Sequence, residues 1–211
     1  MQPYRKKTVF CWSLYDFANQ PFTTLIVTFI YGAYFANEIV LNNEIYGTAL
    51  WSRGISITAI IVAMLSPLMG ALADRGGYRK IYLIFWTWMC VVCSCVMFYA
   101  EPGQIYKALF WFVLANVAFE MGCVFCNAFL PDIAPKKKIG RISGYGWSFG
   151  YVGGLVALGI SLIFFVNTDN PIFGISTDSG ENIRAITIMC GLWLAIFSLP
   201  TFIWVKEKKK T

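Results

Sequence analysis

The sequence predicts an all-α integral membrane protein with six transmembrane helices and both termini in the cytoplasm. Three observations lead to this fold class: apolar stretches of bilayer-spanning length recur six times, charged residues are scarce, and basic residues gather on one side of the stretches. Hydrophobic residues make up 58% of the 211-residue chain and charged residues only 13%, whereas soluble domains carry about 25% charged residues. These features exclude an ordinary soluble domain.

Each apolar stretch is roughly 19–25 residues long, enough for a helix to cross a hydrocarbon core of about 30 Å. The first stretch follows basic residues, as in a signal peptide, but its length and its polar Asp16 and Asn19 indicate a retained helix. We expect one six-helix bundle covering residues 1–211. Its helices are predicted at residues 12–36, 52–73, 81–99, 106–128, 142–166 and 185–205.

The basic residues predict the topology. All but three of the 17 Lys and Arg residues precede the first helix, follow the sixth, or lie between helices two and three or helices four and five. The exceptions are Arg53, Lys107 and Arg184. Because positively charged loops stay in the cytoplasm, both termini are expected there. The net charge of +6 therefore reflects topology and contact with a lipid bilayer, and it does not indicate a nucleic-acid partner.

Two CxxC pairs raise the question of a metal site. Cys90 and Cys93 form one pair, and Cys123 and Cys126 form the other. Both pairs lie inside predicted apolar helices, and the chain contains no histidine. Cysteine packs well as a small apolar side chain between helices. We therefore predict no metal, no cofactor and no structural disulfide.

Polar side chains form a stripe on the first and the fourth predicted helix. Their spacings of three, four and seven residues place them on one face of each helix. A polar face inside a bilayer must contact protein or water. These two helices are therefore expected to line a polar cavity. The residues predicted to bind solute or protons are Asp16, Asn19, Gln20, Asn116, Glu120 and Asn127.

Asp16 and Glu120 are the two carboxylates inside the predicted spans, and both fall in the cytoplasmic half. The spans hold no buried Lys or Arg to neutralise them. Each carboxylate must therefore be hydrated, protonated, or paired with a cationic group of a ligand. Protonation would suit a proton-coupled transporter. The alternative is a structural role, in which the carboxylate caps a helix end or bonds to neighbouring Asn and Thr side chains.

Small residues repeat along the fifth predicted helix. Gly146 and Gly150 are four residues apart, as are Gly150 and Gly154, and Gly153 adjoins them. Such spacing lets the backbone of another helix approach closely. We predict a tight helix–helix contact at these glycines.

The turn after the second helix carries the most specific motif. Residues 70–80 match G-x-x-x-D-R-x-G-x-R-K at every defining position. The segment resembles the signature between helices two and three of major facilitator superfamily transporters. Gly70 is expected to permit close helix contact and Gly77 a tight turn. The resemblance implies that the cytoplasmic gate of the transporter comprises Gly70, Asp74, Arg75, Gly77, Arg79 and Lys80.

Three further strings, at residues 12–19, 119–133 and 141–154, resemble the vacuole-effluxer-like family of autophagy-related amino-acid exporters, which has a large bacterial branch. The resemblance covers essentially the whole chain. It implies a secondary transporter that works by alternating access, with amino acids as the substrate class. Asp16, Asn19, Glu120 and Asn127 match the family strings and lie on the polar stripes.

Facilitator transporters have two six-helix halves with the solute site between them. This chain matches one half, so we expect the N-terminal half of a transporter for small polar solutes, with protons as a second partner. The other half is either part of the same chain or a dimer partner. A bacterial cytoplasmic membrane is the expected location. The alternatives are a non-transporting membrane partner, or remnant, of a transporter, and a membrane enzyme, which the absence of histidine disfavours.

Overall fold

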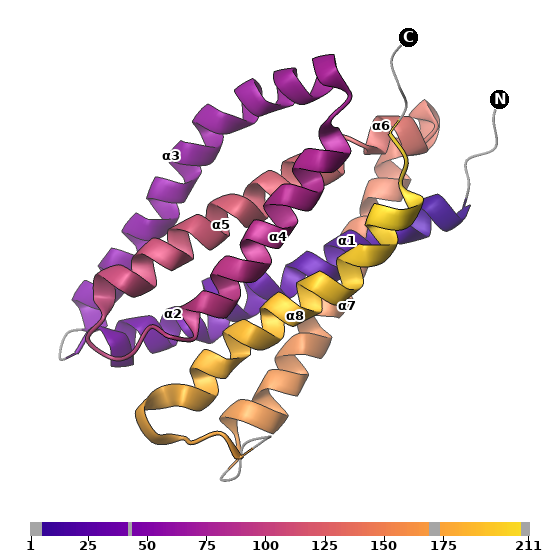
Figure 1. The fold of residues 1–211 in the computed structure, drawn as a ribbon. Helices are drawn as coiled ribbons and strands as arrows, with labels where there is room; N and C mark the ends of the chain where they lie inside the picture. The colour runs from indigo at the N-terminus through magenta and orange to yellow at the C-terminus, as the bar shows by residue number, and fades with distance from the viewer. Residues whose placement is uncertain (1–5, 42–43, 169–173, 208–211) are drawn as a thin grey trace.

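The computed structural model describes residues 6–41, 44–168 and 174–207, with the side chains of residues 73–76 and 179 left out. In this part of the chain the regular structure is helical throughout, without strands. Long helical rods lie side by side, and one of them corresponds to each predicted span (Figure 1). The all-helical prediction is confirmed.

The first rod is interrupted rather than uniform. It runs through α1 (Lys6–Pro21), the π-helical η1 (Phe22–Phe29), α2 (Tyr31–Tyr34) and the π-helical η2 (Phe35–Ile39). The backbone N–H of Ile30 donates to the carbonyl oxygen five residues earlier, at 3.0 Å, which marks the wider turn. Sequence periodicity at 3.6 residues does not anticipate such turns.

Pro21 leaves the carbonyl of Phe17 without its usual helical donor, because proline has no backbone N–H. The indole Nε1–H of Trp193 donates to this oxygen at 3.1 Å. The two rings also stack, with centroids 5.3 Å apart. A donor from another helix therefore satisfies the group that the proline frees, and it ties the last long helix to the first.

The remaining helices are α3 (Glu44–Gly76), α4 (Arg79–Met97), α5 (Ile105–Asn127), α6 (Leu130–Ile133), the 3₁₀ turn η3 (Lys136–Lys138), α7 (Ile139–Ser161), the π-helical η4 (Leu162–Val166), the 3₁₀ turn η6 (Asp178–Gly180) and α8 (Glu181–Trp204). Three of the remaining rods, those formed by α3, by α7 with η4 and by α8, are longer than the apolar stretches predicted, whereas α4 and α5 match theirs in length. The second rod begins at residue 44 instead of 52, so most of the predicted loop at residues 37–51 is helical.

Five helices of the described chain are long and apolar enough to cross a membrane. They correspond to the second to sixth predicted spans. The first rod is not among them, and its α1 segment carries the polar Asp16, Asn19 and Gln20 and is much less apolar than the other rods. The start of α1 and the end of α8 lie at the same end of the bundle, where Lys7 Nζ is 4.3 Å from the centroid of the Trp204 ring.

The rods pack around α1, which contacts α7 and α8, while α4 contacts both α5 and α8, and α3 packs on α5. The predicted glycines of α7 face α1. A Cβ at position 153 would overlap the carbonyl of Phe17, and one at position 154 would lie 2.7 Å from Thr24 Oγ1. The tight helix contact expected from the glycine spacing is therefore present, and its partner is α1.

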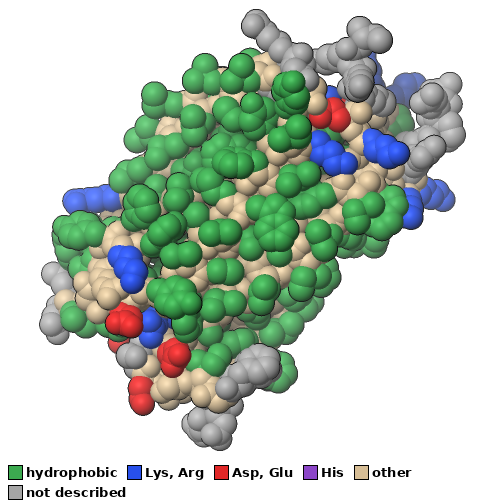
Figure 2. Space-filling model, viewed as in Figure 1, with side chains coloured by type: hydrophobic (Ala, Val, Ile, Leu, Met, Phe, Trp, Pro, Cys, Tyr) green, Lys and Arg blue, Asp and Glu red, His purple; other side chains and the backbone are tan. Residues whose placement is uncertain are grey.

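The outer surface is apolar between two charged ends. Figure 2 shows hydrophobic side chains covering the middle of the visible face, with Lys, Arg, Asp and Glu gathered toward the two ends. Many large apolar side chains on this surface are exposed, among them Phe110, Trp147 and Leu155. An apolar surface this extensive suits lipid or another helical protein, not water.

The packing of α7 on α1 can be tested with two identical substitutions in one helix. Gly153→Ala places a methyl group against backbone atoms of Phe17, which cannot move aside, and should cost about 1–3 kcal/mol in the free energy of unfolding. Gly159→Ala meets no atom within 4 Å, and should be neutral or stabilising by up to about 1 kcal/mol. Thermal unfolding in detergent measures both, and equal unfolding temperatures would contradict the packing.

Candidate functional site

Three of the predicted polar residues lie on α1 and face different neighbours. Asp16 and Gln20 lie against α7: a Cβ at position 146 would overlap the Asp16 carboxylate, and one at position 150 would lie 3.5 Å from Gln20 Oε1. Asn19 is buried and lies on the side of α5. The glycines of α7 thus make room for the polar face of α1.

The other three predicted residues lie on α5 and differ in burial. Asn116 is buried, whereas Glu120 and Asn127 are exposed on the surface of the described structure. Glu120 was predicted to line a polar cavity, but its side chain lies on the outside of the described structure.

The two polar stripes meet at Cys123, a half-buried thiol on α5. Asn19 Nδ2 donates to Cys123 Sγ at 3.4 Å, and the carboxylates of Asp16 and Glu120 both act electrostatically on this thiol. From the sequence, Cys123 was expected only to pack between helices as a small side chain of a CxxC pair. The structure brings Asn19 and Cys123 into contact between α1 and α5. Asp16 lies beside this contact on the α7 side, and Glu120 lies one turn before Cys123 on the exposed side of α5. These four residues are called the polar region.

Aromatic and indole contacts hold α1 at this position. Trp12 Nε1–H donates to the carbonyl of Cys126 at 2.8 Å, and Phe22 stacks on Phe119 with ring centroids 5.1 Å apart. Tyr15 shares a 2.8 Å hydrogen bond with Thr87 of α4. Trp12 and Tyr15 precede Asn19 along the first rod, and Phe22 follows it. Contacts on both sides of Asn19 therefore fix the position of the polar region.

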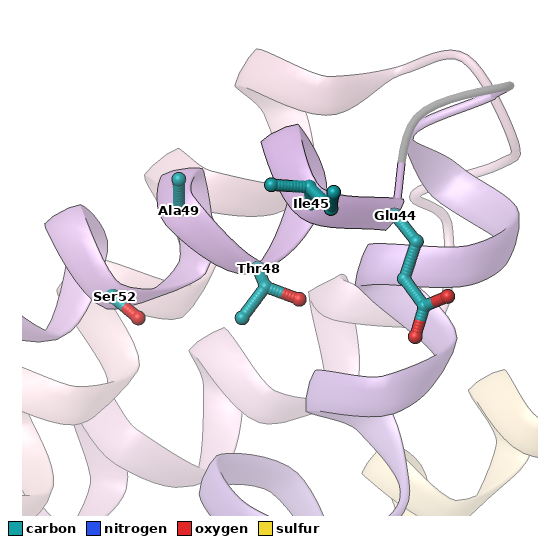
Figure 3. Close-up of a pocket in the computed structure, with 5 residues that line it drawn as sticks. All are labelled: Glu44, Ile45, Thr48, Ala49 and Ser52. Atoms are coloured by element: carbon teal, nitrogen blue, oxygen red, sulfur yellow. The ribbon is translucent and has the colours of Figure 1, made fainter.

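A surface hollow lies away from this region. Figure 3 shows its lining side chains along the first part of α3. None of the predicted site residues lines it. The lining residues are Glu44, Ile45, Thr48, Ala49 and Ser52. A hollow formed by one helix has no opposing wall, so we assign it no binding role.

Arg79, from the predicted gate motif, is the centre of a charged cluster at the Lys7–Trp204 end of the molecule. Its Nη2 lies 2.8 Å from Asp132 Oδ2, and its Nε lies 3.2 Å from Glu207 Oε1. Nη1 donates to the carbonyl of Ala128 at 2.9 Å, and the guanidinium carbon is 5.4 Å from the centroid of the Phe129 ring. The side chain of Arg79 is only 10% exposed, and the adjacent carboxylates compensate its charge.

Glu207 also caps α4. Its carboxylate accepts the backbone N–H of Arg79 at 3.0 Å and that of Lys80 at 3.3 Å. The first N–H groups of a helix lack partners within the helix, and a carboxylate there is stabilised by the helix dipole. Thus the segment after α8 is attached to the start of α4. Sequence analysis missed the roles of Asp132 and Glu207 because neither is near Arg79 in sequence.

Among the other motif residues, the structure agrees with the prediction for Gly77 but not with that for Gly70. Gly77 has φ 64°, a left-handed conformation that suits the expected tight turn. The close helix contact expected of Gly70 is not found within the described chain, where a Cβ at this position would meet no atom within 4 Å. Gly70 lies on the poorly covered helix α3, which explains the missing neighbour. The side chains of Asp74 and Arg75 lie outside the described part.

No three His, Cys, Asp or Glu side chains within the described ranges approach closely enough to hold a metal ion. The cysteines described are free thiols. The polar region between α1 and α5 thus offers carboxylate, amide and thiol groups, a set suited to reversible binding of a polar solute or a proton. The fold and this region define a multi-pass helical membrane protein with a polar face.

Comparison with known proteins identifies the family. Residues 40–211 match the family described as "Vacuole effluxer Atg22 like", and the chain belongs to it. The family model and the relatives named below identify a family of transporters of the major facilitator type. No solved structure matches the chain.

Relatives occur in bacteria and fungi. An "Uncharacterized MFS-type transporter YxiO" of Bacillus subtilis is 23% identical over 93% of this chain and 46% of its own length. An "Autophagy-related protein 22" of Yarrowia lipolytica is 21% identical over 75% of this chain and 35% of its own. An uncharacterised protein of Aquifex aeolicus is 29% identical over 74% and 38%. The chain therefore spans less than half the length of these relatives.

The charged cluster predicts a large effect of one substitution. Arg79→Gln leaves the carboxylates of Asp132 and Glu207 without their cation and should cost about 2–4 kcal/mol in unfolding free energy, since removing one partner of a poorly exposed pair is strongly destabilising. Lys137→Gln, at an exposed position near the same end, should stay within about 0.5 kcal/mol of the unsubstituted chain. Scanning fluorimetry in detergent compares them, and similar unfolding temperatures would rule out a structural role for the cluster.

Proposed function

We propose that this chain forms the N-terminal six-helix half of a secondary transporter that moves small polar solutes, amino acids in particular, by alternating access. The observation that carries the proposal is the polar region, in which Asn19 of α1 contacts Cys123 of α5 and the carboxylates of Asp16 and Glu120 lie within electrostatic reach of that thiol. Membership of the Atg22-like family supports the same function.

The chemistry of the region suits a zwitterionic solute. Carboxylates of Asp16 and Glu120 would attract an ammonium group, and the amides of Asn19, Gln20 and Asn116 offer both donors and acceptors. The exposed Asn127 would extend this face toward the cytoplasm. An ionisable group in an otherwise apolar helix is a functional candidate by default. Glu120 is the better candidate for proton coupling, because it is exposed on the open side.

A second six-helix half would complete the site. Only 6% of the apolar stretch of α3 is buried, against 33–50% for the other four spanning helices. The exposed Glu120 and the uncontacted Gly70 require a neighbour for the roles proposed here. The relatives are more than twice as long as the segment that matches this chain, which leaves enough length for a second half. We propose that it packs over the face that includes α3 and Glu120.

The G-x-x-x-D-R-x-G-x-R-K segment is proposed as the gate. The cluster of Arg79, Asp132 and Glu207 connects the start of α4 with the segments after α5 and α8. Asp74, Arg75 and Lys80 would contact the second half when the transporter is closed on this side. The excess of basic residues at this end supports its placement in the cytoplasm, and the bacterial relatives support a bacterial cytoplasmic membrane.

Proton coupling through Glu120 is tested by solute accumulation in proteoliposomes of the complete transporter. One pH unit across the membrane provides about 1.4 kcal/mol per proton, equivalent to an accumulation ratio of about 10 for one coupled proton. Glu120→Gln should reduce this ratio to about 1 while solute still equilibrates. Glu38→Gln, at an exposed position in η2, should leave it unchanged.

Two other outcomes have clear meanings. An unaltered ratio in Glu120→Gln would remove this residue from coupling, and the same experiment with Asp16→Asn would then test the second carboxylate. No solute flux from the complete protein would contradict the transport proposal. In that case a non-transporting membrane partner becomes the better explanation.

A further inference from the structure

Arg184 is a buried cation that the proposed transport function does not use. It lies in the first turn of α8, at the end of the molecule opposite Trp204, and is 6% exposed. Its Nη1 donates to the carbonyl of Phe98 at 3.3 Å, and its guanidinium carbon is 5.6 Å from the centroid of the Phe98 ring. Arg184 therefore contacts the C-terminal end of α4, where carbonyl groups lack helical partners.

Two donor atoms in this region have no protein acceptor. Nε of Arg184 is buried without a hydrogen-bond partner, and so is the hydroxyl of Tyr31 in α2. Tyr31 is fully buried in α2, which packs against α8, and its hydroxyl lies within electrostatic reach of the Arg184 charge. In the described part of the chain, no carboxylate forms a salt bridge with Arg184.

The contact with α4 compensates only part of the Arg184 charge. The C-terminal end of a helix carries about half a negative charge, whereas the guanidinium carries a full positive one. Buried charges are normally paired with an opposite charge, and buried donors nearly always have an acceptor. A water molecule could accept hydrogen bonds from Arg184 and Tyr31, but it would not neutralise the remaining charge.

Nearby carboxylates form no ion pair with Arg184 among the described residues, and this includes Glu181, which is half-buried and lies one turn earlier in α8. Glu38 and Glu101 influence the neighbouring Tyr34 electrostatically, but both are exposed to solvent. Exposed charges are screened over about 8–10 Å at physiological ionic strength. They therefore neither pair with Arg184 in this conformation nor prevent the approach of an anion.

We propose that Arg184 and Tyr31 form a binding site for a small monovalent anion, either a halide or a single carboxylate group, where α8, α2 and the end of α4 meet. The anion would accept hydrogen bonds from Arg184 Nε–H and from the Tyr31 hydroxyl. Both donors are enclosed, so the site favours an anion of this size over phosphate or sulfate, and entry requires side-chain rotation. This proposal does not depend on the transport function.

The test is thermal unfolding of the purified full-length chain in detergent, at constant ionic strength and pH. Chloride, or acetate in a parallel series, replaces gluconate stepwise. A site that binds the folded state should give a saturable rise in unfolding temperature. Arg184→Gln should weaken the apparent affinity by about 10-fold or more, because it removes a charged donor. Tyr31→Phe should weaken it by about 2–10-fold.

Arg53→Gln is the matched control, because Arg53 is an exposed arginine on α3. It should leave the anion dependence unchanged. A rise with chloride identifies a halide site, and a rise with acetate alone identifies a carboxylate-bearing ligand. No anion-specific rise, or an equal rise in Arg184→Gln, would overturn the proposal. If Arg184→Gln does not fold, an unchanged anion affinity in Tyr31→Phe is sufficient to overturn it.

Discussion

The close approach of α7 to α1 is the contact on which the rest of the structure depends. Pro21 leaves the Phe17 carbonyl free, Trp193 of α8 donates to that oxygen, and Gly153 of α7 leaves room beside it. α1 is thus held by two helices at one level, with Asp16 placed against the glycine face of α7. Asn19, on the neighbouring side of α1, contacts Cys123 of α5. A membrane offers little hydrophobic drive for helix association, so this combination of small residues and satisfied backbone groups determines where the polar region forms.

Much of the fold follows from sequence patterns that have a direct physical basis. Apolar stretches of bilayer length predict the rods, and the spacing of Gly146, Gly150 and Gly154 predicts a close helix contact. Helix ends are less predictable, since hydropathy detects the apolar part of α3 but not its polar first turns from Glu44 onward. The π-helical turns of the first rod and the partner of the α7 glycines depend on tertiary packing. Neither leaves a local signal in the sequence.

In the candidate site, too, some features could be predicted from the sequence and others depend on tertiary packing. Periodicity predicted the polar stripes on α1 and α5, and the structure brings them together at Asn19 and Cys123. It did not predict that Glu120 would remain exposed, because exposure depends on which helices cover α5. The charged cluster was recognised only at Arg79, within the facilitator motif. Glu207 is far from it in sequence, and only the packing of the segment after α8 against the start of α4 makes the carboxylate its partner.

The central claim is that a solute binds between α1 and α5, and Cys123 provides a direct measurement of it. In a complete transporter that retains Cys123 as its one thiol, we would measure the rate of alkylation by a membrane-permeant maleimide with and without saturating transported amino acid. The account predicts that the solute slows the reaction markedly, whereas a matched protein retaining Cys95, which lies beside Gly191 of α8, reacts at the same rate in both conditions. Equal rates at Cys123 with and without a transported solute would contradict it.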